Sequence, residues 1–194
     1  MQNQDIPNVH FNKVFENINW EDKQIAGKTF ERCRFYKCSL KGSFFDDCIF
    51  EKTVFEACDI SLIKFKDSQF NEVTITDSKA IGIAWHAANN PLSIHFIGSK
   101  ISFSSFYGKS YKKGQFINCI AEEVDFTNCN LSQSNFEGTD CRNAIFTNTD
   151  LTQANFVGAL NYSIDLVTNK VKKAKFSLPE ALSFLNNLGI VLVN

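Results

Sequence analysis

The stretch from Ser134 to Gly158 decides the fold: it reads SNFEG TDCRN AIFTN TDLTQ ANFVG, a succession of five-residue units. The third position of each unit holds Phe, Cys or Leu, and the first position holds a small residue. An α-helix has a period of about 3.6 residues and a simple strand a period of about two, so neither produces this spacing. The stretch is therefore an internal repeat, which is the sequence signature of a solenoid.

The same period covers most of the chain in two runs. Large residues recur at every fifth position from Phe15 to Trp85, with only Ala80 small, and again from Phe96 to Phe156 with a few smaller residues. The residues two places before these centres are mostly Ser, Cys, Thr, Ala or other small residues. Side chains two apart on an extended backbone point to the same side. Both sets are therefore predicted to point inward, large beside small.

These units resemble the A-(D/N)-(L/F)-x-x unit of the pentapeptide-repeat proteins. The resemblance is carried by segments such as Ser134–Gly138, Thr149–Gln153 and Ala154–Gly158, and it covers roughly residues 11–160. It implies an all-β fold, a right-handed quadrilateral β-helix with one pentapeptide per side and four per coil. Residues twenty apart should then stack in columns, and about seven coils are expected.

The two runs are out of phase by one residue, and the break lies between His86 and His95. If the break adds six residues, the column Phe30, Phe50 and Phe70 continues into the column Phe96, Phe116, Phe136 and Phe156. This interpretation predicts a short loop around Asn89, Asn90 and Pro91 that leaves the solenoid. A one-residue bulge is the alternative.

Three regions follow from the pattern. Residues 1–32 are expected to form an irregular N-terminal cap or first coil, because Lys13, Lys23 and Lys28 occupy positions that should be small and buried. Residues 33–160 are expected to form the regular solenoid, interrupted at about 86–95. Residues 161–194 are expected to form a connection, a short α-helix and a tail. The sequence from Ser177 to Glu180 predicts a capping box with proline near the first turn, and Gly189 is predicted to end the helix.

The expected helix carries an apolar stripe and is followed by an apolar tail. This surface either covers the last coil or forms a two-fold contact with a second copy. The ending, with the segments Asn161–Asp165, Lys173–Phe176 and Leu188–Ile190, resembles that of the Qnr quinolone-resistance and McbG microcin-immunity members of the family. In Qnr-like proteins the C-terminal helix joins two rods end to end, so the resemblance implies a homodimer. The predicted interface residues are Leu178, Leu182, Leu185, Leu188 and Ile190.

No pattern typical of a catalytic or cofactor site occurs in the sequence. It contains no nucleophile elbow, phosphate loop, H-E-x-x-H or dinucleotide fingerprint. Six of the seven cysteines fall on the small inward position and Cys141 falls on a centre, so all are interpreted as core residues. We expect a non-enzymatic protein without catalytic residues, metal or cofactor, in a reducing cytoplasm, contacting neither nucleic acid nor a membrane directly.

Charge is distributed unevenly along the chain. Residues 114–165 contain seven acids and a single basic residue, Arg142. Resemblance to Qnr and McbG implies that such a rod imitates duplex DNA, binds DNA gyrase or topoisomerase IV, and protects it from a quinolone or a peptide toxin. The predicted partner-binding residues are the acids Glu122, Glu123, Asp125, Glu137, Asp140 and Asp150, and the break residues His86, Asn89, Asn90 and His95.

The competing hypothesis is a scaffold or interaction solenoid with an unrelated partner. Basic residues gather at 23–41 and again at 100–113. A DNA-binding saddle is itself positive and would repel these bands. The sequence leaves both hypotheses open.

Overall fold

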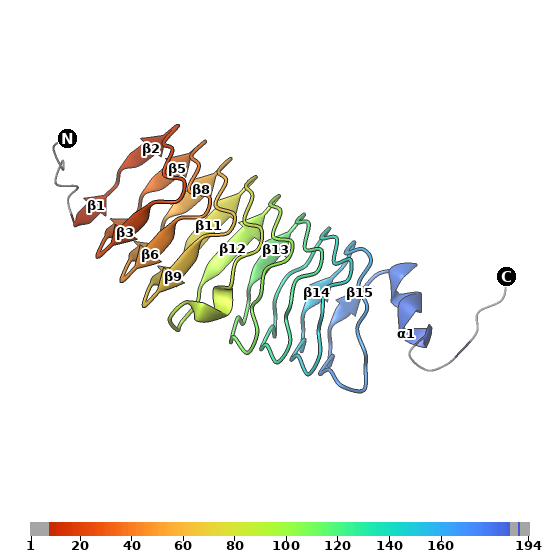
Figure 1. Cartoon of the computed structure of the whole chain (residues 1–194). Coiled ribbons are helices and arrows are strands. Elements are labelled where there is room, and N and C mark those ends of the chain that lie inside the picture. Colours follow the sequence, from red (N-terminus) through yellow and green to blue (C-terminus); the bar gives the residue numbers. More distant parts are fainter. Residues whose placement is uncertain (1–7, 187–189, 191–194) are drawn as a thin grey trace.

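The computed structural model describes residues 8–186 and residue 190. In this range the chain winds into a right-handed, four-sided parallel β-solenoid of about 8 turns, with one short helical segment at its C-terminal end (Figure 1). The all-β fold expected from the period of five is confirmed. The count of turns is slightly higher than the seven coils expected, because pairing extends past residue 160.

The strands stack in columns along the sides of the rod. The first side consists of β1 (Val9–Phe11), β4 (Thr29–Glu31), β7 (Ile49–Glu51) and β10 (Gln69–Asn71). The second side consists of β2 (Val14–Glu16), β5 (Arg34–Tyr36), β8 (Val54–Glu56), β11 (Val73–Thr76), β12 (Ile94–Ile97) and β13 (Gln115–Ile117), and later β14 (Asn155–Phe156) and β15 (Lys175–Phe176). The third side is held by single bridges, beginning with Asn19 to Ser39. The fourth side consists of β3 (Gln24–Ala26), β6 (Phe44–Asp46) and β9 (Lys64–Lys66).

Equivalent residues of neighbouring turns lie directly on top of one another. Phe50 pairs with Phe30 and with Phe70, twenty residues away in each direction. Its ring stacks on theirs with centroid distances of 5.1 and 5.0 Å. The ring of Phe45, from the fourth side of the same turn, meets Phe50 edge-on at 5.3 Å. Stacked contacts along the rod and edge contacts across it fill the interior with rigid aromatic area.

The small inward residues complete each turn through hydrogen bonds. Ser68 illustrates this: its Oγ donates to the carbonyl of Phe45 at 3.1 Å and accepts the N–H of Cys48 at 3.0 Å. A buried hydroxyl or thiol at this position thus bonds backbone groups of the preceding turn. Small polar side chains at this position leave room for the rings and satisfy backbone groups, which explains why the repeat mostly alternates large and small.

The break in phase inserts a single residue. Residues of β11 pair with those of β12 twenty-one positions later, so Ile75 lies beside Phe96. The expected fusion of the Phe30–Phe70 column with the Phe96 column is therefore wrong. Phe96 instead continues the second side, where it stacks on Phe116 at 5.6 Å. The chain absorbs the extra residue with a 3-10 turn, η1 (Trp85–Ala87), and an irregular stretch that interrupts the first side.

Regular pairing extends beyond the expected boundaries of 33 and 160. At the N-terminal end Val9 already pairs with Thr29 in register. In this first turn Lys13 and Lys23 are exposed although they stand at inward positions, and Trp20 is half-buried. At the other end Asp150 bridges to Lys170 and Phe156 pairs with Phe176. Part of the connection expected to be irregular is thus a further turn of the solenoid.

The C-terminal helical segment begins later than the sequence from Ser177 to Glu180 predicts. It consists of a 3-10 turn, η2 (Glu180–Leu182), followed by α1 (Ser183–Asn186), and the predicted stop at Gly189 lies outside the described residues. The expected capping box does not form. The Oγ of Ser177 accepts the N–H of Gly158 at 2.9 Å, and the residue at the helix start is Pro179, which has no side chain capable of capping. The ring of Phe184 packs edge-on against Phe176 at 4.7 Å and so covers the last turn.

Candidate functional site

The six acids predicted to bind a partner lie outside the core but not in a single row. Asp150 lies on the first side, Glu137 on the second, Glu122 and Asp140 on the third, Asp125 on the fourth, and Glu123 at the corner between the third and fourth. The structure therefore distributes these carboxylates around the circumference of the rod. We call the zone formed by residues 114–165 the acidic sleeve.

Three of these acids also hold the backbone. In each case an aspartate Oδ1 accepts the N–H two residues later: Asp125 from Thr127 at 2.9 Å, Asp140 from Arg142 at 3.1 Å and Asp150 from Thr152 at 2.9 Å. This is the Asx turn, which asparagine forms equally well. Asparagines at equivalent positions do so here, as Asn135 does with the N–H of Glu137 at 3.1 Å. At these three positions the turn requires the side-chain oxygen but not the charge.

The protonation of Asp150 reflects this environment. Partial burial works to raise the pKa of its carboxyl group. The hydrogen bonds from Thr152 and the positive charge of Lys170 outweigh that effect and hold the pKa below its usual value. The carboxylate is therefore fully charged at neutral pH, as a negative surface requires.

The turn that follows the acidic sleeve is basic. It carries Lys170, Lys172, Lys173 and Lys175, and Lys170 lies next to Asp150. These lysines separate most of the sleeve from the C-terminal helix. A charge count over residues 114–165 alone does not reveal them.

The four residues predicted around the break are not brought together. His86 is exposed in η1. Its backbone N–H donates to the backbone carbonyl of Ser105, on the fourth side, at 3.2 Å. His95 is half-buried in β12 on the second side, where burial lowers its pKa. The N–H of Asn89 donates to the carbonyl of Ser68 at 2.9 Å, and the side chain of Asn90 is exposed. The two histidines therefore do not form a common site.

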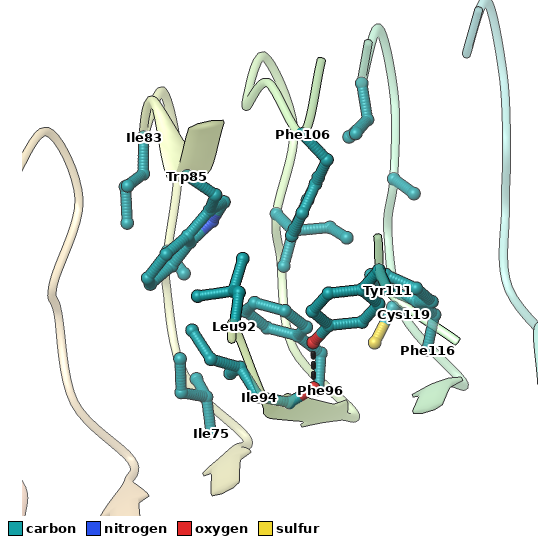
Figure 2. Close-up of a cluster of buried hydrophobic side chains, with 14 of the residues drawn as sticks. Ile75, Ile83, Trp85, Leu92, Ile94, Phe96, Phe106, Tyr111, Phe116 and Cys119 are labelled. Carbon is teal, nitrogen blue, oxygen red and sulfur yellow. Dashed lines mark hydrogen bonds between the residues drawn. The ribbon is translucent and has the colours of Figure 1, made fainter. Parts of the chain in front are cut away.

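The break segment is anchored to the core. Figure 2 shows Leu92 among Trp85, Ile94 and Phe96, and the hydroxyl of Tyr111 donating to the carbonyl of Ile94. Ala88 and Leu92 are both buried.

A lysine that the pattern did not single out as functional fixes the same segment. Lys109 occupies a small inward position and is buried, which lowers the pKa of its ammonium group. Its Nζ donates to the carbonyl of Ala88 at 2.5 Å and to Oδ1 of Asn90 at 3.1 Å. The sequence did carry a sign of this role: Lys109 stands at an inward position that is occupied mostly by small residues elsewhere in the second run.

The residues of the predicted dimer interface are placed as follows. Leu178, Leu182 and Ile190 expose 76%, 44% and 46% of their surface, Leu185 is half-buried, and Leu188 lies outside the described residues. The described end of the rod thus presents apolar side chains to solvent beyond those that cover the last turn.

The buried cysteines of the solenoid are held in the thiol form. Burial raises the pKa of Cys58 and Cys119 to about 11 and that of Cys129 to about 12, so these side chains stay as thiols and are poor nucleophiles. Among residues 8–186 and 190, no group of three His, Cys, Asp or Glu is placed to hold a metal ion. No helix in that range is long and apolar enough to cross a membrane.

Comparisons with known proteins agree with this architecture. The family model "Pentapeptide repeat region" matches residues 28–91, and the model "Pentapeptide repeats (8 copies)" matches residues 115–160. A search of curated proteins found no match to the sequence.

Solved structures of the same fold include QnrB1, described as a plasmid-mediated fluoroquinolone resistance protein. A trypsin-treated QnrB1 variant is 16% identical, with a TM-score of 0.64 over 95% of this chain and 100% of that chain. Full-length QnrB1 is also 16% identical, with a TM-score of 0.50 over 94% of this chain and 100% of that one. HetL, a pentapeptide repeat protein from the cyanobacterium Nostoc sp. Strain PCC 7120, is 13% identical, with a TM-score of 0.48 over 86% and 84% of the two chains. The five-residue period, the twenty-residue turns and the two family matches together show that this chain belongs to the pentapeptide-repeat family.

Proposed function

We propose that this protein binds a type II topoisomerase, DNA gyrase or topoisomerase IV, in place of duplex DNA and thereby protects the enzyme from a quinolone or a peptide toxin. The acidic sleeve carries the proposal. Its seven acids and single arginine give residues 114–165 a net charge of −6. These residues span about two and a half turns, or about 12 Å of rod at ~4.8 Å per turn, and duplex DNA carries about seven charges over that length.

The arrangement of the acids suits this function better than a single row would. Phosphates surround the DNA duplex, and the carboxylates of the sleeve likewise lie on all four sides of the rod. A binding surface that recognises DNA by its charge meets a similar field whichever side of this rod approaches. The description of QnrB1 as a fluoroquinolone resistance protein supports the proposal by analogy of fold, at 16% identity.

A scaffold for an unrelated partner is the second candidate. The basic residues at 23–41 and 100–113, together with the lysines of the last turn, favour it. A positive DNA-binding saddle would repel these regions, so only the sleeve can enter it.

The three turn-forming aspartates allow a direct test of the electrostatic claim. The triple variant Asp125→Asn, Asp140→Asn, Asp150→Asn removes three charges and keeps each Asx turn, because asparagine supplies the same acceptor. We expect its melting temperature to match that of the unchanged protein. Its affinity for purified gyrase, measured by biolayer interferometry at low salt, should fall at least about tenfold, since the attraction is electrostatic. Added salt should weaken the binding of the unchanged protein in the same way.

A matched control removes three charges outside the sleeve. The variant Asp46→Asn, Asp59→Asn, Asp67→Asn changes the net charge by the same amount and should retain gyrase binding. Equal loss in both triple variants would mean that net charge, not the sleeve, governs the interaction. If the unchanged protein binds neither gyrase nor topoisomerase IV at low salt, with or without DNA, the topoisomerase proposal is wrong and the scaffold is favoured.

A further inference from the structure

One corner of the rod holds large apolar residues in a conformation that disfavours them. The corner between the third and fourth sides runs through Gly42, Leu62, Gly82, Phe103 and Glu123 in successive turns. Leu62 has φ of 58° and Phe103 has φ of 61°. Apart from Ala57, every other non-glycine residue with positive φ in the described chain is polar or charged. A bulky side chain in the left-handed region is unfavourable, and such strain is found preferentially at functional positions.

Both side chains are displayed to solvent. Leu62 exposes 49% of its surface and Phe103 exposes 54%. Gly82 lies between them, and a Cβ built on it would stand 2.8 Å from Cδ2 of Leu62. The Leu62 side chain therefore lies across Gly82, on the side of the turn that carries Phe103. Glycine leaves room for this approach, and its φ of 67° lies in the left-handed region that favours glycine.

An apolar groove lies beside Leu62 on the fourth side. It has a volume of about 580 Å³, and Gly42, Gly82, Ala84, Ala87 and Phe65 contribute to its lining. On the fourth side β9 is followed by η1 instead of a further strand (Figure 1). Small residues, Gly82, Ala84 and Ala87, line the groove there. Side chains of glycine and alanine leave room that aliphatic or aromatic side chains of a partner would fill.

The surroundings of the groove are positively charged. Lys64 lines it, and Lys66 follows on the same strand. On the adjoining third side Lys79 bridges to Lys100. With Lys41, these residues make five lysines. Four acids lie near them: Asp22 lines the groove, Asp46 and Asp59 lie on the same two sides and turns, and Asp67 lies 3.8 Å from Lys66. The lysines are in excess around the apolar floor, which favours an acidic, apolar segment over a basic one.

We infer that the Leu62–Phe103 corner is a docking site for an acidic protein segment that inserts large apolar side chains into the groove beside Leu62. A protein segment fits the groove better than a nucleic acid strand, because its glycine, alanine and leucine residues provide no stacking surface for bases and no hydrogen bonds to their edges. The ring of Phe65 in the lining is buried, and the exposed ring of Phe103 does not line the groove. The site lies on a different part of the rod from the acidic sleeve. The inference can therefore be tested independently of topoisomerase binding.

Replacing the two strained residues separates docking from folding. In the variant Leu62→Asn, Phe103→Asn, asparagine accepts the left-handed conformation more readily, so the melting temperature should hold or rise. The probe is a fluorescent twelve-residue peptide that alternates glutamate with leucine and phenylalanine, followed by anisotropy on the full-length protein. We expect the unchanged protein to bind it saturably and the variant to bind it at least about tenfold more weakly.

Two controls define the site. The variant Ile145→Asn, Leu160→Asn removes two apolar side chains of similar exposure elsewhere on the rod and should bind the peptide normally. The variant Lys64→Glu, Lys79→Glu, Lys100→Glu should lose binding. A peptide in which lysine replaces glutamate should not bind the unchanged protein.

Three results would overturn the inference. The first is that the unchanged protein fails to bind the acidic peptide. The second is that the Leu62→Asn, Phe103→Asn variant binds the peptide as tightly as the unchanged protein does. Alternatively, a twelve-nucleotide oligothymidine binds in a manner that depends on Phe103 while the peptide does not, which would assign the corner to nucleic acid.

Discussion

At the scale of single residues, the fold depends on pairs of inward side chains in each pentapeptide. The large residue supplies stacked apolar area, and the small residue two places earlier bonds the backbone of a neighbouring turn. Both positions could be read from the sequence, because the period of five marks them directly. The Asx turns formed by the aspartates were not predicted, since an acid that holds a turn and an acid that only faces solvent look alike in the sequence.

Truncating a stacked ring tests the inward column. Phe50 exposes 1% of its surface and stacks on rings above and below. Phe50→Ala should lower the free energy of unfolding by about 3–5 kcal/mol, because the rigid turns cannot close the cavity. Glu137→Ala, at an exposed position, should change it by no more than about 0.5 kcal/mol. Urea denaturation measures both, and similar losses for the two variants would contradict the columnar core.

His10 makes stability depend on pH. It stacks on Phe30 at 5.0 Å, and burial, with the nearby charges of Lys13 and Lys28, lowers its pKa. In the unfolded chain the imidazole takes up a proton near pH ~6.5, whereas the folded protein resists protonation. The unfolded state thus binds more protons, and stability should fall as the pH drops below about 6.5.

The variant His10→Phe isolates this contribution. It extends the Phe30–Phe70 column by one ring and removes the titrating group. We expect a higher melting temperature at pH 5 and a smaller difference between pH 5 and pH 7 than in the unchanged protein. An unaltered pH dependence would assign the effect to other groups, His95 first among them.

At the scale of elements, the break and the helix show where periodicity stops being informative. A six-residue loop and a one-residue bulge shift a five-residue pattern by the same phase, so the sequence could not separate them. The structure selects the single residue, because Ile75 pairs with Phe96. The predicted capping box does not form, because the Oγ of Ser177 instead accepts the N–H of Gly158 in the preceding turn.

Lys109 is expected to hold the break segment in place. Lys109→Met keeps the length of the side chain but removes the donors to Ala88 and Asn90. The variant should lose about 1–3 kcal/mol of stability, because the buried carbonyl of Ala88 remains without a partner. Hydrogen exchange at Asn89 and Ser93 should accelerate. Lys112→Met, an exposed lysine in the same turn, is the control, and equal exchange in both variants would refute the anchoring role.

At the scale of the whole molecule, the rod has two ends of different character. The first turn carries lysines at inward positions, whereas the last is covered by Phe184 and presents exposed leucines. The candidate dimer surface could be located from the sequence as an apolar stripe at a solenoid end. The sequence could not show which of its residues cover the last turn and which face outward, because that depends on how the short helix lies against Phe176.

The C-terminal leucines are proposed to join two rods. Leu178→Ser with Leu182→Ser removes exposed apolar area and leaves Phe184 on the last turn, so the fold should be retained. Light scattering at micromolar concentration should report a dimer for the unchanged protein and a monomer for the variant. A monomer already in the unchanged protein would contradict the proposal.

The proposal that the rod replaces DNA on a topoisomerase is tested most directly by enzyme protection. The measurement is DNA supercoiling by purified gyrase in the presence of an inhibitory concentration of a fluoroquinolone, with increasing amounts of this protein. We predict that supercoiling is restored in a dose-dependent manner, and that the Asp125→Asn, Asp140→Asn, Asp150→Asn variant requires at least about tenfold more protein. Inhibition that persists unchanged at every concentration of the folded protein would contradict the account.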